Sequence, residues 1–264
     1  VKVSTTSGDG SGSGTLTFGV QKDQNGTAQI TVTVIDSENS THAETFTLTV
    51  TVINDSPVLT SIGNQSTKED TDSTITLIAT DVDIATNSQT LSFIATSDTE
   101  SLVKVSTTSG DGSGSGTLTF DVQKDQNGTA QITVTVKDSE DSTHAETFTL
   151  TVKAVNDPPI AVNDEYTVNE DTELTGNVNV LDNDSDVDSG TLTTVVIDAV
   201  SNGTLTLNSD GTFNYTGTNN FNGSDNFTYQ LNDGAGGLDT ATATITVTAI
   251  NDSPVLTSIG NQFT

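Results

Sequence analysis

The stretch ETFTLTVTV, residues 44–52, alternates apolar side chains with threonine. Its apolar members are Phe46, Leu48, Val50 and Val52. A period of two places them on one face of a β-strand, and Thr and Val suit a pleated, half-buried surface. The same alternation occurs in AQITVTV (130–136) and ATATITVTA (241–249), and helical spacing is hard to find anywhere. The sequence therefore predicts an all-β protein.

Internal repetition organises the chain. Residues 1–50 and 103–152, which are offset by 102 positions, differ at only three places: Gly19/Asp121, Ile35/Lys137 and Asn39/Asp141. An Asn-Asp pair close to a proline recurs three times, in INDSPV (53–58), VNDPPI (155–160) and INDSPV (250–255). The last twelve residues repeat 56–67 with one change, from Ser66 to Phe263. Such repetition at a fixed period indicates an array of similar domains.

These landmarks predict four parts of the chain. They are the C-terminal half of one repeat (1–53), a complete repeat (54–155), a second and divergent repeat (156–250), and the first strand of a following repeat (251–264). Because both ends fall inside a repeat, we expect the sequence to be a segment of a much longer repetitive chain.

Short strand candidates fill the complete repeat. They are residues 57–62, 74–79, 90–95, 102–106, 115–120, 130–136 and 145–154. Turns rich in Gly, Asn and Asp separate them, and seven such strands in about 100 residues are typical of an immunoglobulin-like antiparallel β-sandwich. A closed barrel is the structural alternative. Aromatic residues make up only 5% of the chain and Trp is absent, so we expect thin, aliphatic cores that benefit from outside support.

Charge narrows the choice of partners. The net charge is −29, and the seven positive residues are all Lys. Nucleic-acid binding needs a basic surface, so it is excluded, and an anionic membrane surface is disfavoured for the same reason. No apolar run is long enough to insert into a membrane, and the absence of Cys excludes disulfides and thiolate metal sites. A metal cation is the simplest partner of opposite sign.

Acidic residues gather at the expected strand ends. VLDNDSDVDSG (180–190) has aspartates at positions 182, 184, 186 and 188. In an extended chain these four carboxylates face the same side and repel each other unless a cation lies among them. Sets of oxygen ligands in irregular cages suit Ca²⁺ better than Mg²⁺. A solvated loop without a metal is the alternative, and the run lacks the Gly and Glu that an EF-hand requires.

The ordered set of acids and Asn-Asp linkers resembles the tandem cadherin-like and bacterial immunoglobulin-like repeats of large biofilm-associated and RTX-type surface adhesins. The resemblance implies Ca²⁺ ligands at three junctions. At the middle junction they are Glu69, Asp125, Asn156, Asp157, Asp186, Asp188 and Asp233, assisted by Asp182 or Asp184. At the preceding junction they are Asp23, Asn54, Asp55, Asp81, Asp83 and Asp138, and at the last junction Glu170, Asn251 and Asp252. Asp36, the repeat counterpart of Asp138, completes the candidate set.

The last junction departs from the pattern. Aligning residues 127–138 with 222–233 places Asn220 where Asp125 stands, so this junction binds more weakly unless Asp225 substitutes.

The resemblance implies a stalk that is stiffened by Ca²⁺ on the cell surface and whose partners are neighbouring repeats of the same chain. The alternative is a stretch of an extracellular fibre in which identical chains share domains or strands. A carbohydrate-binding module is less favoured, because aromatic residues for sugar stacking are few. We predict no catalysis: His42 and His144 are the same position in two repeats, and no partner residue for either is evident.

Overall fold

The computed structural model describes residues 1–7, 12–176, 178–256, 258 and 260. The chain forms two compact units, Val1–Ala154 and Val155–Thr264. Part of the expected last strand (251–264) lies outside the described residues, and residues 251–256, 258 and 260 carry no strand.

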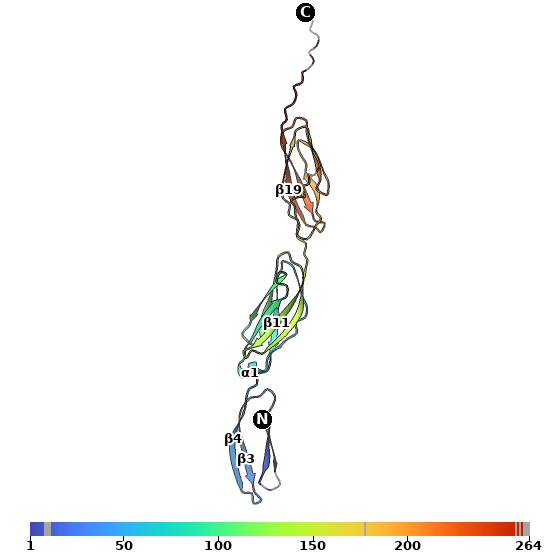
Figure 1. Ribbon diagram of the computed structural model, residues 1–264. Coiled ribbons are helices and arrows are strands. Elements are labelled where there is room, and N and C mark those ends of the chain that lie inside the picture. Colours follow the sequence, from blue (N-terminus) through green and yellow to red (C-terminus); the bar gives the residue numbers. More distant parts are fainter. Residues whose placement is uncertain (8–11, 177, 257, 259, 261–264) are drawn as a thin grey trace. The chain divides into compact units, whose positions relative to one another are not determined.

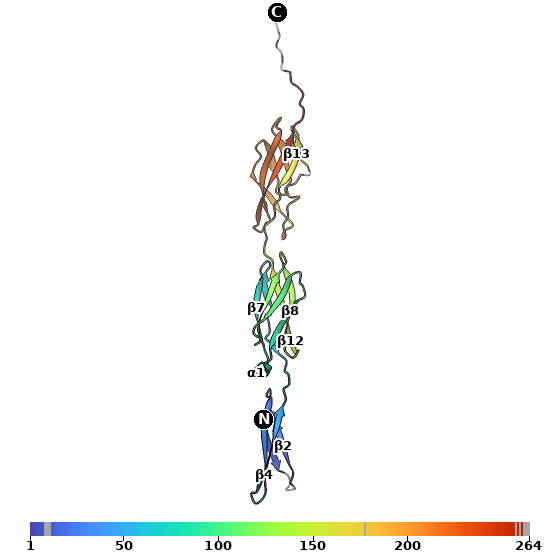
Figure 2. The ribbon, with the colours of Figure 1, turned by 90° about the vertical axis from the view of Figure 1, so that its left-hand side faces the viewer.

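The first part of unit 1 consists of two antiparallel hairpins (Figure 2). Their strands are β1 (Lys2–Ser7), β2 (Gly14–Gly19), β3 (Gly26–Ile35) and β4 (Thr41–Val50). The hairpins touch through Phe18 and Phe46, whose rings meet edge to face with centroids 6.0 Å apart. Much of the apolar face stays exposed, because Val34 is 67% exposed whereas its repeat counterpart Val136 is fully buried.

The complete repeat is a two-layer β-sandwich (Figure 1). Its elements are β5 (Val58–Leu59), β6 (Gln65–Lys68), β7 (Ser73–Thr80), α1 (Asp83–Asn87), β8 (Leu91–Ser97), β9 (Val103–Ser109), β10 (Ser115–Val122), β11 (Gly128–Asp138) and β12 (Thr143–Lys153). One sheet has the order β5-β7-β10-β9 and the other β6-β12-β11-β8. All pairs are antiparallel except β6 and β12, which run parallel.

All seven predicted strands are present, but the first one is split. The candidate 57–62 forms only the two-residue β5, after which the chain crosses to the other sheet and continues as β6. Gly63 lies in the crossing segment. The short helix α1 was not predicted, because a five-residue turn is too brief to show a helical period. Figure 1 shows α1 at the end of the repeat that faces residues 1–53.

The core of the complete repeat follows the alternation in the sequence. In β11, Ala130, Ile132, Val134 and Val136 are each at most 2% exposed, and the intervening threonines lie outside. Phe120 packs edge to face on Phe148, with ring centroids 6.2 Å apart. The other core residues are aliphatic apart from Phe93, as the composition predicted.

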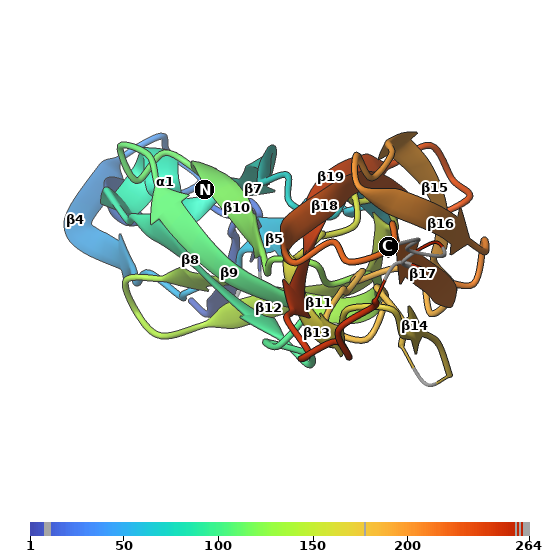
Figure 3. The same ribbon diagram turned by 90° about the horizontal axis from the view of Figure 1, so that it is seen from above.

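Unit 2 is a second sandwich, seen end-on in Figure 3. Its strands are β13 (Asp164–Asn169), β14 (Glu173–Leu174), β15 (Thr193–Asp198), β16 (Gly203–Leu207), β17 (Phe213–Gly217), β18 (Gly223–Asn232) and β19 (Leu238–Thr248). The sheets are β13-β19-β18-β15 and β14-β17-β16, and β13 runs parallel to β19.

The expectation of a thin aliphatic core is wrong for unit 2. Here the rings of Tyr166, Phe213, Phe227 and Tyr229 form a continuous series of contacts, with neighbouring centroids 4.9–6.3 Å apart. The few aromatic residues of the chain are concentrated in this repeat, which the overall percentage does not reveal. Both repeats are antiparallel Ig-like sandwiches, so the closed barrel is excluded.

Candidate metal centre

One end of the complete repeat gathers the linker and three acidic side chains. Asp83 Oδ2 accepts the backbone N–H of Asp55 at 2.8 Å, and Asp81 Oδ1 accepts the backbone N–H of Asp83 at 2.8 Å. Asn54 Nδ2 donates to Asp138 Oδ2 at 3.0 Å. Asp83 and Asp138 are 4% and 3% exposed. The linker, the start of α1 and the end of β11 therefore meet through oxygen atoms.

Unit 2 repeats this arrangement at its own N-terminal end. Asp188 Oδ2 accepts the backbone N–H of Asp157 at 2.7 Å, and Asp186 Oδ1 accepts that of Asp188 at 2.8 Å. Asn156 Nδ2 donates to Asp233 Oδ2 at 2.7 Å, and this hydrogen bond is the main reason that the pKa of Asp233 is lowered. Two repeats of different sequence thus build the same set of hydrogen bonds around an Asp-Val-Asp tripeptide and an Asn-Asp linker.

In both tripeptides the first aspartate keeps one oxygen without a partner. Asp81 Oδ2 and Asp186 Oδ2 are buried and accept no hydrogen bond. Burial raises the pKa of Asp81, and the negative charges of Asp83, Asp138 and Asp55 raise it further. A buried, unpaired carboxylate oxygen is costly unless a cation or a donor completes it. The donors are all oxygen atoms, the type that a hard divalent cation such as Ca²⁺ prefers.

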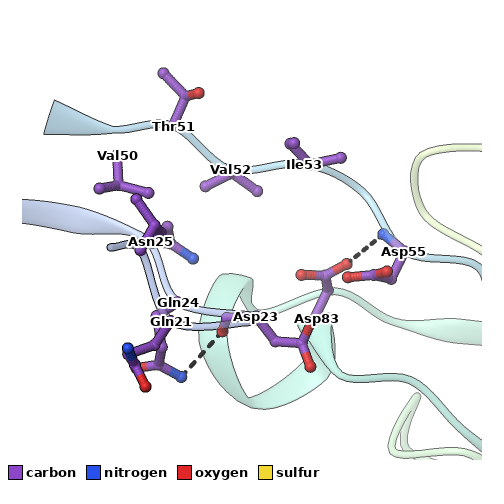
Figure 4. Close-up of a pocket in the computed structure, with 11 residues that line it drawn as sticks. Gln21, Asp23, Gln24, Asn25, Val50, Thr51, Val52, Ile53, Asp55 and Asp83 are labelled. Carbon is purple, nitrogen blue, oxygen red and sulfur yellow. Dashed lines mark hydrogen bonds between the residues drawn. The ribbon is translucent and has the colours of Figure 1, made fainter. Parts of the chain in front are cut away.

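A hollow of about 270 Å³ opens beside this cluster in unit 1. It is lined by residues 20–21, 23–25 and 50–53 together with Asp55 and Asp83. Figure 4 shows the side chains of Asp23, Asp55 and Asp83 in this space, with the Asp55 N–H donating to Asp83. Asp23 comes from the loop between β2 and β3, so the first hairpins contribute an acid to the same region.

The opposite end of each repeat carries a second recurring set. Asp70 Oδ1 accepts the backbone N–H of Asp125 at 2.9 Å, and Asn127 Nδ2 donates to Glu69 Oε2 at 3.3 Å. Glu69 is 2% exposed, and Asp125 Oδ1 is buried without a hydrogen-bond partner. Asp70 and Asn127 were not among the predicted site residues, although each lies within two positions of one that was.

In unit 2 the corresponding end has an amide in place of the acid. Asp171 Oδ1 accepts the backbone N–H of Asn220 at 3.0 Å, and Asn222 Nδ2 donates to Glu170 Oε2 at 3.4 Å. Asn220 has a φ of 55° and Asp125 a φ of 54°, so the two residues occupy the same backbone position. The carboxylate of Asp125 is therefore missing here.

Asp225 does not replace it. This residue is 2% exposed in β18, where its carboxylate accepts the backbone N–H groups of Ser201 and Asn202 and the hydroxyl of Tyr215. The expectation that Asp225 substitutes for Asp125 is wrong, because its oxygens already hold the loop before β16.

The side chains of the four aspartates in residues 180–190 do not lie together on one side of an extended segment. Residues 180–183 form a turn, so the premise of an extended chain is wrong there. Asp184 Oδ1 accepts the backbone N–H of Val162 at 2.7 Å, and Tyr229 donates its hydroxyl towards Asp184 Oδ2 at 3.2 Å. Asp182 is exposed. Of the four, Asp188 contacts the Asn156-Asp157 linker directly, and Asp186 is joined to it through the backbone N–H of Asp188.

Asp184 belongs instead to a buried cluster around Tyr229. The Tyr229 hydroxyl lies closer to Asp164 Oδ2, at 2.8 Å, so its single hydrogen is shared between the two carboxylates, and Asp164 is 8% exposed. Burial raises the pKa of Asp164 to about 6, and the charge of Asp184 contributes to this rise. Burial likewise raises the pKa of Asp184.

Three of the exposed predicted residues, Asp36, Asn251 and Asp252, lie outside the clusters described above. Asp36 Oδ1 accepts the backbone N–H groups of Glu38 and Ser40, as Asp138 does from Glu140 and Ser142. Asn251 and Asp252 follow β19 and are exposed. The expectation that Glu69 and Asp125 share a cation with Asp186 and Asp188 stays a prediction.

The two histidines have different surroundings. His144 Nδ1 accepts the backbone N–H of Leu59 at 3.2 Å and so anchors β5, whereas His42 Nε2 lies 3.2 Å from Glu44 on an exposed strand. Among the described residues, no helix has the length and apolarity that a membrane crossing needs.

Comparisons with known proteins agree with this architecture. A model of the bacterial Ig domain family matches residues 54–151, and one of the bacterial cadherin-like domain family matches residues 156–249. No curated protein sequence matches the chain.

Solved structures show the same fold. The human desmocollin-1 ectodomain is 13% identical with a TM-score of 0.51, covering 89% of this chain and 49% of that one. Repeats EC21-23 of human CDH23 are 19% identical with a TM-score of 0.50, covering 89% and 78%. This chain thus spans about half the length of the desmocollin-1 ectodomain. Its two complete repeats therefore match two bacterial domain families, the Ig-like family over residues 54–151 and the cadherin-like family over residues 156–249.

Proposed function

We propose that the chain is a stalk segment of an extracellular surface adhesin and that Ca²⁺ stiffens it at the ends of its repeats. One observation carries the proposal: Asp81 and Asp186 occupy the same place in two divergent repeats, and each has a buried oxygen without a partner. In a solvated loop without a metal, we would not expect a buried carboxylate oxygen without a partner at the same position of both repeats. Domains of this kind are typical of surface proteins, which supports the extracellular location.

In unit 1, Asn54, Asp81, Asp83 and Asp138 would hold the ion, and Asp23 and Asp55 lie close enough to share in binding. A bound Ca²⁺ supplies the positive charge that these carboxylates lack. Without it, the linker is a short segment flanked by like charges. Oxygens from the linker, the loop before α1, the end of β11 and the first hairpins then share one partner, so the freedom of the linker is reduced.

Extracellular Ca²⁺ modules bind at roughly 10⁻⁴–10⁻³ M. The proposed sites would therefore fill outside a cell and stay empty in cytosol, so stiffening would follow secretion. The role needs no catalytic group, and we expect the purified chain to have no hydrolytic activity.

Small-angle X-ray scattering with 5 mM Ca²⁺ or with excess chelator tests the proposal, with calorimetric Ca²⁺ titration beside it. We expect a longer and narrower distribution of interatomic distances with Ca²⁺. The double variant Asp81→Asn, Asp83→Asn should lose part of this change, and Asp121→Asn, which alters an exposed aspartate of β10, should keep all of it. Identical scattering in both conditions and no heat of binding would refute the proposal.

A fibre stretch, in which domains or strands of identical chains associate, is the second candidate. Sedimentation velocity from 1 to 100 µM distinguishes the two functions, since a fibre-forming chain associates with concentration and a stalk segment stays monomeric.

A further inference from the structure

Gln89 is a buried polar residue that none of the sites above includes. It is 5% exposed and follows α1, whose end is marked by Ser88 with a φ of 58°. This left-handed residue lets the chain reverse after one helical turn. As a result, the Gln89 side chain lies next to the cluster formed by Asn54, Asp81, Asp83 and Asp138.

The two ends of the Gln89 amide are in different situations. Nε2 donates to Asn54 Oδ1 at 2.5 Å and to Glu140 Oε1 at 3.3 Å. Oε1 is buried and has no hydrogen-bond partner. Since Asn54 also donates to Asp138, a chain of hydrogen bonds connects Gln89 with the acids of the candidate metal centre.

A buried amide oxygen without a partner costs about 1–3 kcal/mol. Asp81 Oδ2 is the second such oxygen in the same cluster, and the two residues flank α1 on either side. A single cation lying between them would satisfy both, because Ca²⁺ accepts amide carbonyls and carboxylates together in sets of six to eight oxygens. Glu140 and Asn54 hold the Nε2 end, which leaves the carbonyl oxygen available for a ligand.

We propose that Gln89 Oε1 is a neutral ligand of the cation held at the N-terminal end of the complete repeat. The inference rests on the proposed Ca²⁺ function and adds a ligand from a loop that the Asp-Val-Asp tripeptide and the linker do not reveal. In this proposal the role of α1 is to position Gln89 Oε1 beside the cation.

Unit 2 has no equivalent side chain. Leu91 pairs with Asp138 at the end of β11, and Thr193 pairs with Asn232, so Leu192 lies level with Asp233. The loop between the Asp-Val-Asp tripeptide and the next strand is therefore shorter in unit 2. Leu91 follows Asp83 by eight positions, whereas Leu192 follows Asp188 by four, and this shorter loop contains no helix. The two sites should therefore differ, with the additional oxygen in unit 1 only.

Two substitutions separate ligation from packing. Gln89→Leu keeps the size of the side chain but removes the oxygen, and Gln89→Glu keeps an oxygen ligand and adds a charge. In calorimetric Ca²⁺ titrations of the full chain, we expect Gln89→Leu to weaken one site by about 3–10-fold, as the loss of one ligand among several implies. Gln89→Glu places its second oxygen beside Glu140 Oε1, but it keeps the ligand oxygen and should therefore bind more tightly than Gln89→Leu. Gln131→Leu, at an exposed position of β11, is the matched control and should change nothing.

A second measurement reports on the amide itself. In a chain labelled with ¹⁵N-glutamine, the Gln89 side-chain resonance should shift with the same Ca²⁺ dependence as the affected site. If the unaltered chain binds Ca²⁺ while this resonance and the affinity of Gln89→Leu are unchanged, Gln89 is not a ligand and the proposed function stands. A Gln89→Glu variant as weak as Gln89→Leu also overturns the ligand role. If the unaltered chain binds no Ca²⁺, the proposed function itself fails.

Discussion

The substitution Asp81→Asn should have opposite effects on stability with and without Ca²⁺. The Asp81 carboxylate is surrounded by the charges of Asp83, Asp138 and Asp55, and its pKa is raised by burial and by these neighbours. Two unit charges about 7 Å apart repel by about 2.4 kcal/mol at an effective dielectric near 20. Screening by salt reduces the sum, so we expect the neutral variant to be more stable by about 1–2 kcal/mol in chelator.

With Ca²⁺ the order reverses, because the variant lacks a charged ligand. A site filled at 100 times its dissociation constant stabilises the fold by about 2.7 kcal/mol. If the substitution weakens binding about 100-fold, about 2.3 kcal/mol of that stabilisation is lost at the same Ca²⁺ concentration, which exceeds the gain expected in chelator. Urea unfolding of the full chain in 5 mM Ca²⁺ and in chelator measures both effects, and a calorimetric titration gives the change in affinity.

Asp186→Asn is the matched variant in unit 2, and Asp121→Asn controls for the loss of an exposed charge. A variant at Asp81 that is less stable in both conditions, with unchanged Ca²⁺ affinity, would refute the reasoning. The carboxylate would then serve only to cap the turn through its hydrogen bond to the Asp83 N–H.

Three further predictions follow from the structure. Asn220→Asp restores the missing carboxylate at the end of unit 2 and should tighten Ca²⁺ binding there by about 3–10-fold in calorimetric titrations; an unchanged affinity would contradict the assigned position. Because the pKa of Asp164 is raised to about 6, its ionisation costs stability as the pH rises from about 4 to 6, so in chelator Asp164→Asn should be about 1–3 kcal/mol more stable at pH 7 and flatten the pH dependence of unfolding. A Cβ at Gly116 would lie 2.6 Å from Thr108 O and 2.7 Å from the Phe93 ring, so Gly116→Ala should destabilise the repeat by about 1–3 kcal/mol, whereas Gly14→Ala, at the same place in the first hairpins, should cost little in thermal unfolding.

Much of the fold was predictable because strands leave a local signature. Alternation in 130–136 sets which side chains of β11 are buried, and that pattern requires no knowledge of the partner strands. The division of the first strand into β5 and β6 was not predictable, since it depends on which sheet offers a free edge. Likewise, one turn of helix at 83–87 is too short for a period to appear.

The site residues could be predicted from the sequence where the residue type alone marks a metal ligand. Asp81, Asp83 and Asp138 stand out as acids at strand ends. Gln89 does not, because nothing in a lone glutamine marks its oxygen as buried. The separation of Asp184 from Asp186 also escaped the sequence, since the turn at 180–183 directs the earlier carboxylates towards Tyr229.

The parallel pairing of the first and last strands in each repeat has a mechanical consequence. When a repeat is pulled at its two ends, β6 and β12 slide past each other along their length. All hydrogen bonds of the ladder are then loaded at the same time, whereas an antiparallel pair pulled from one end opens bond by bond. The β6–β12 ladder spans four residue pairs and the β13–β19 ladder six. Under a steady tensile load the β13–β19 ladder should therefore resist rupture longer than the β6–β12 ladder.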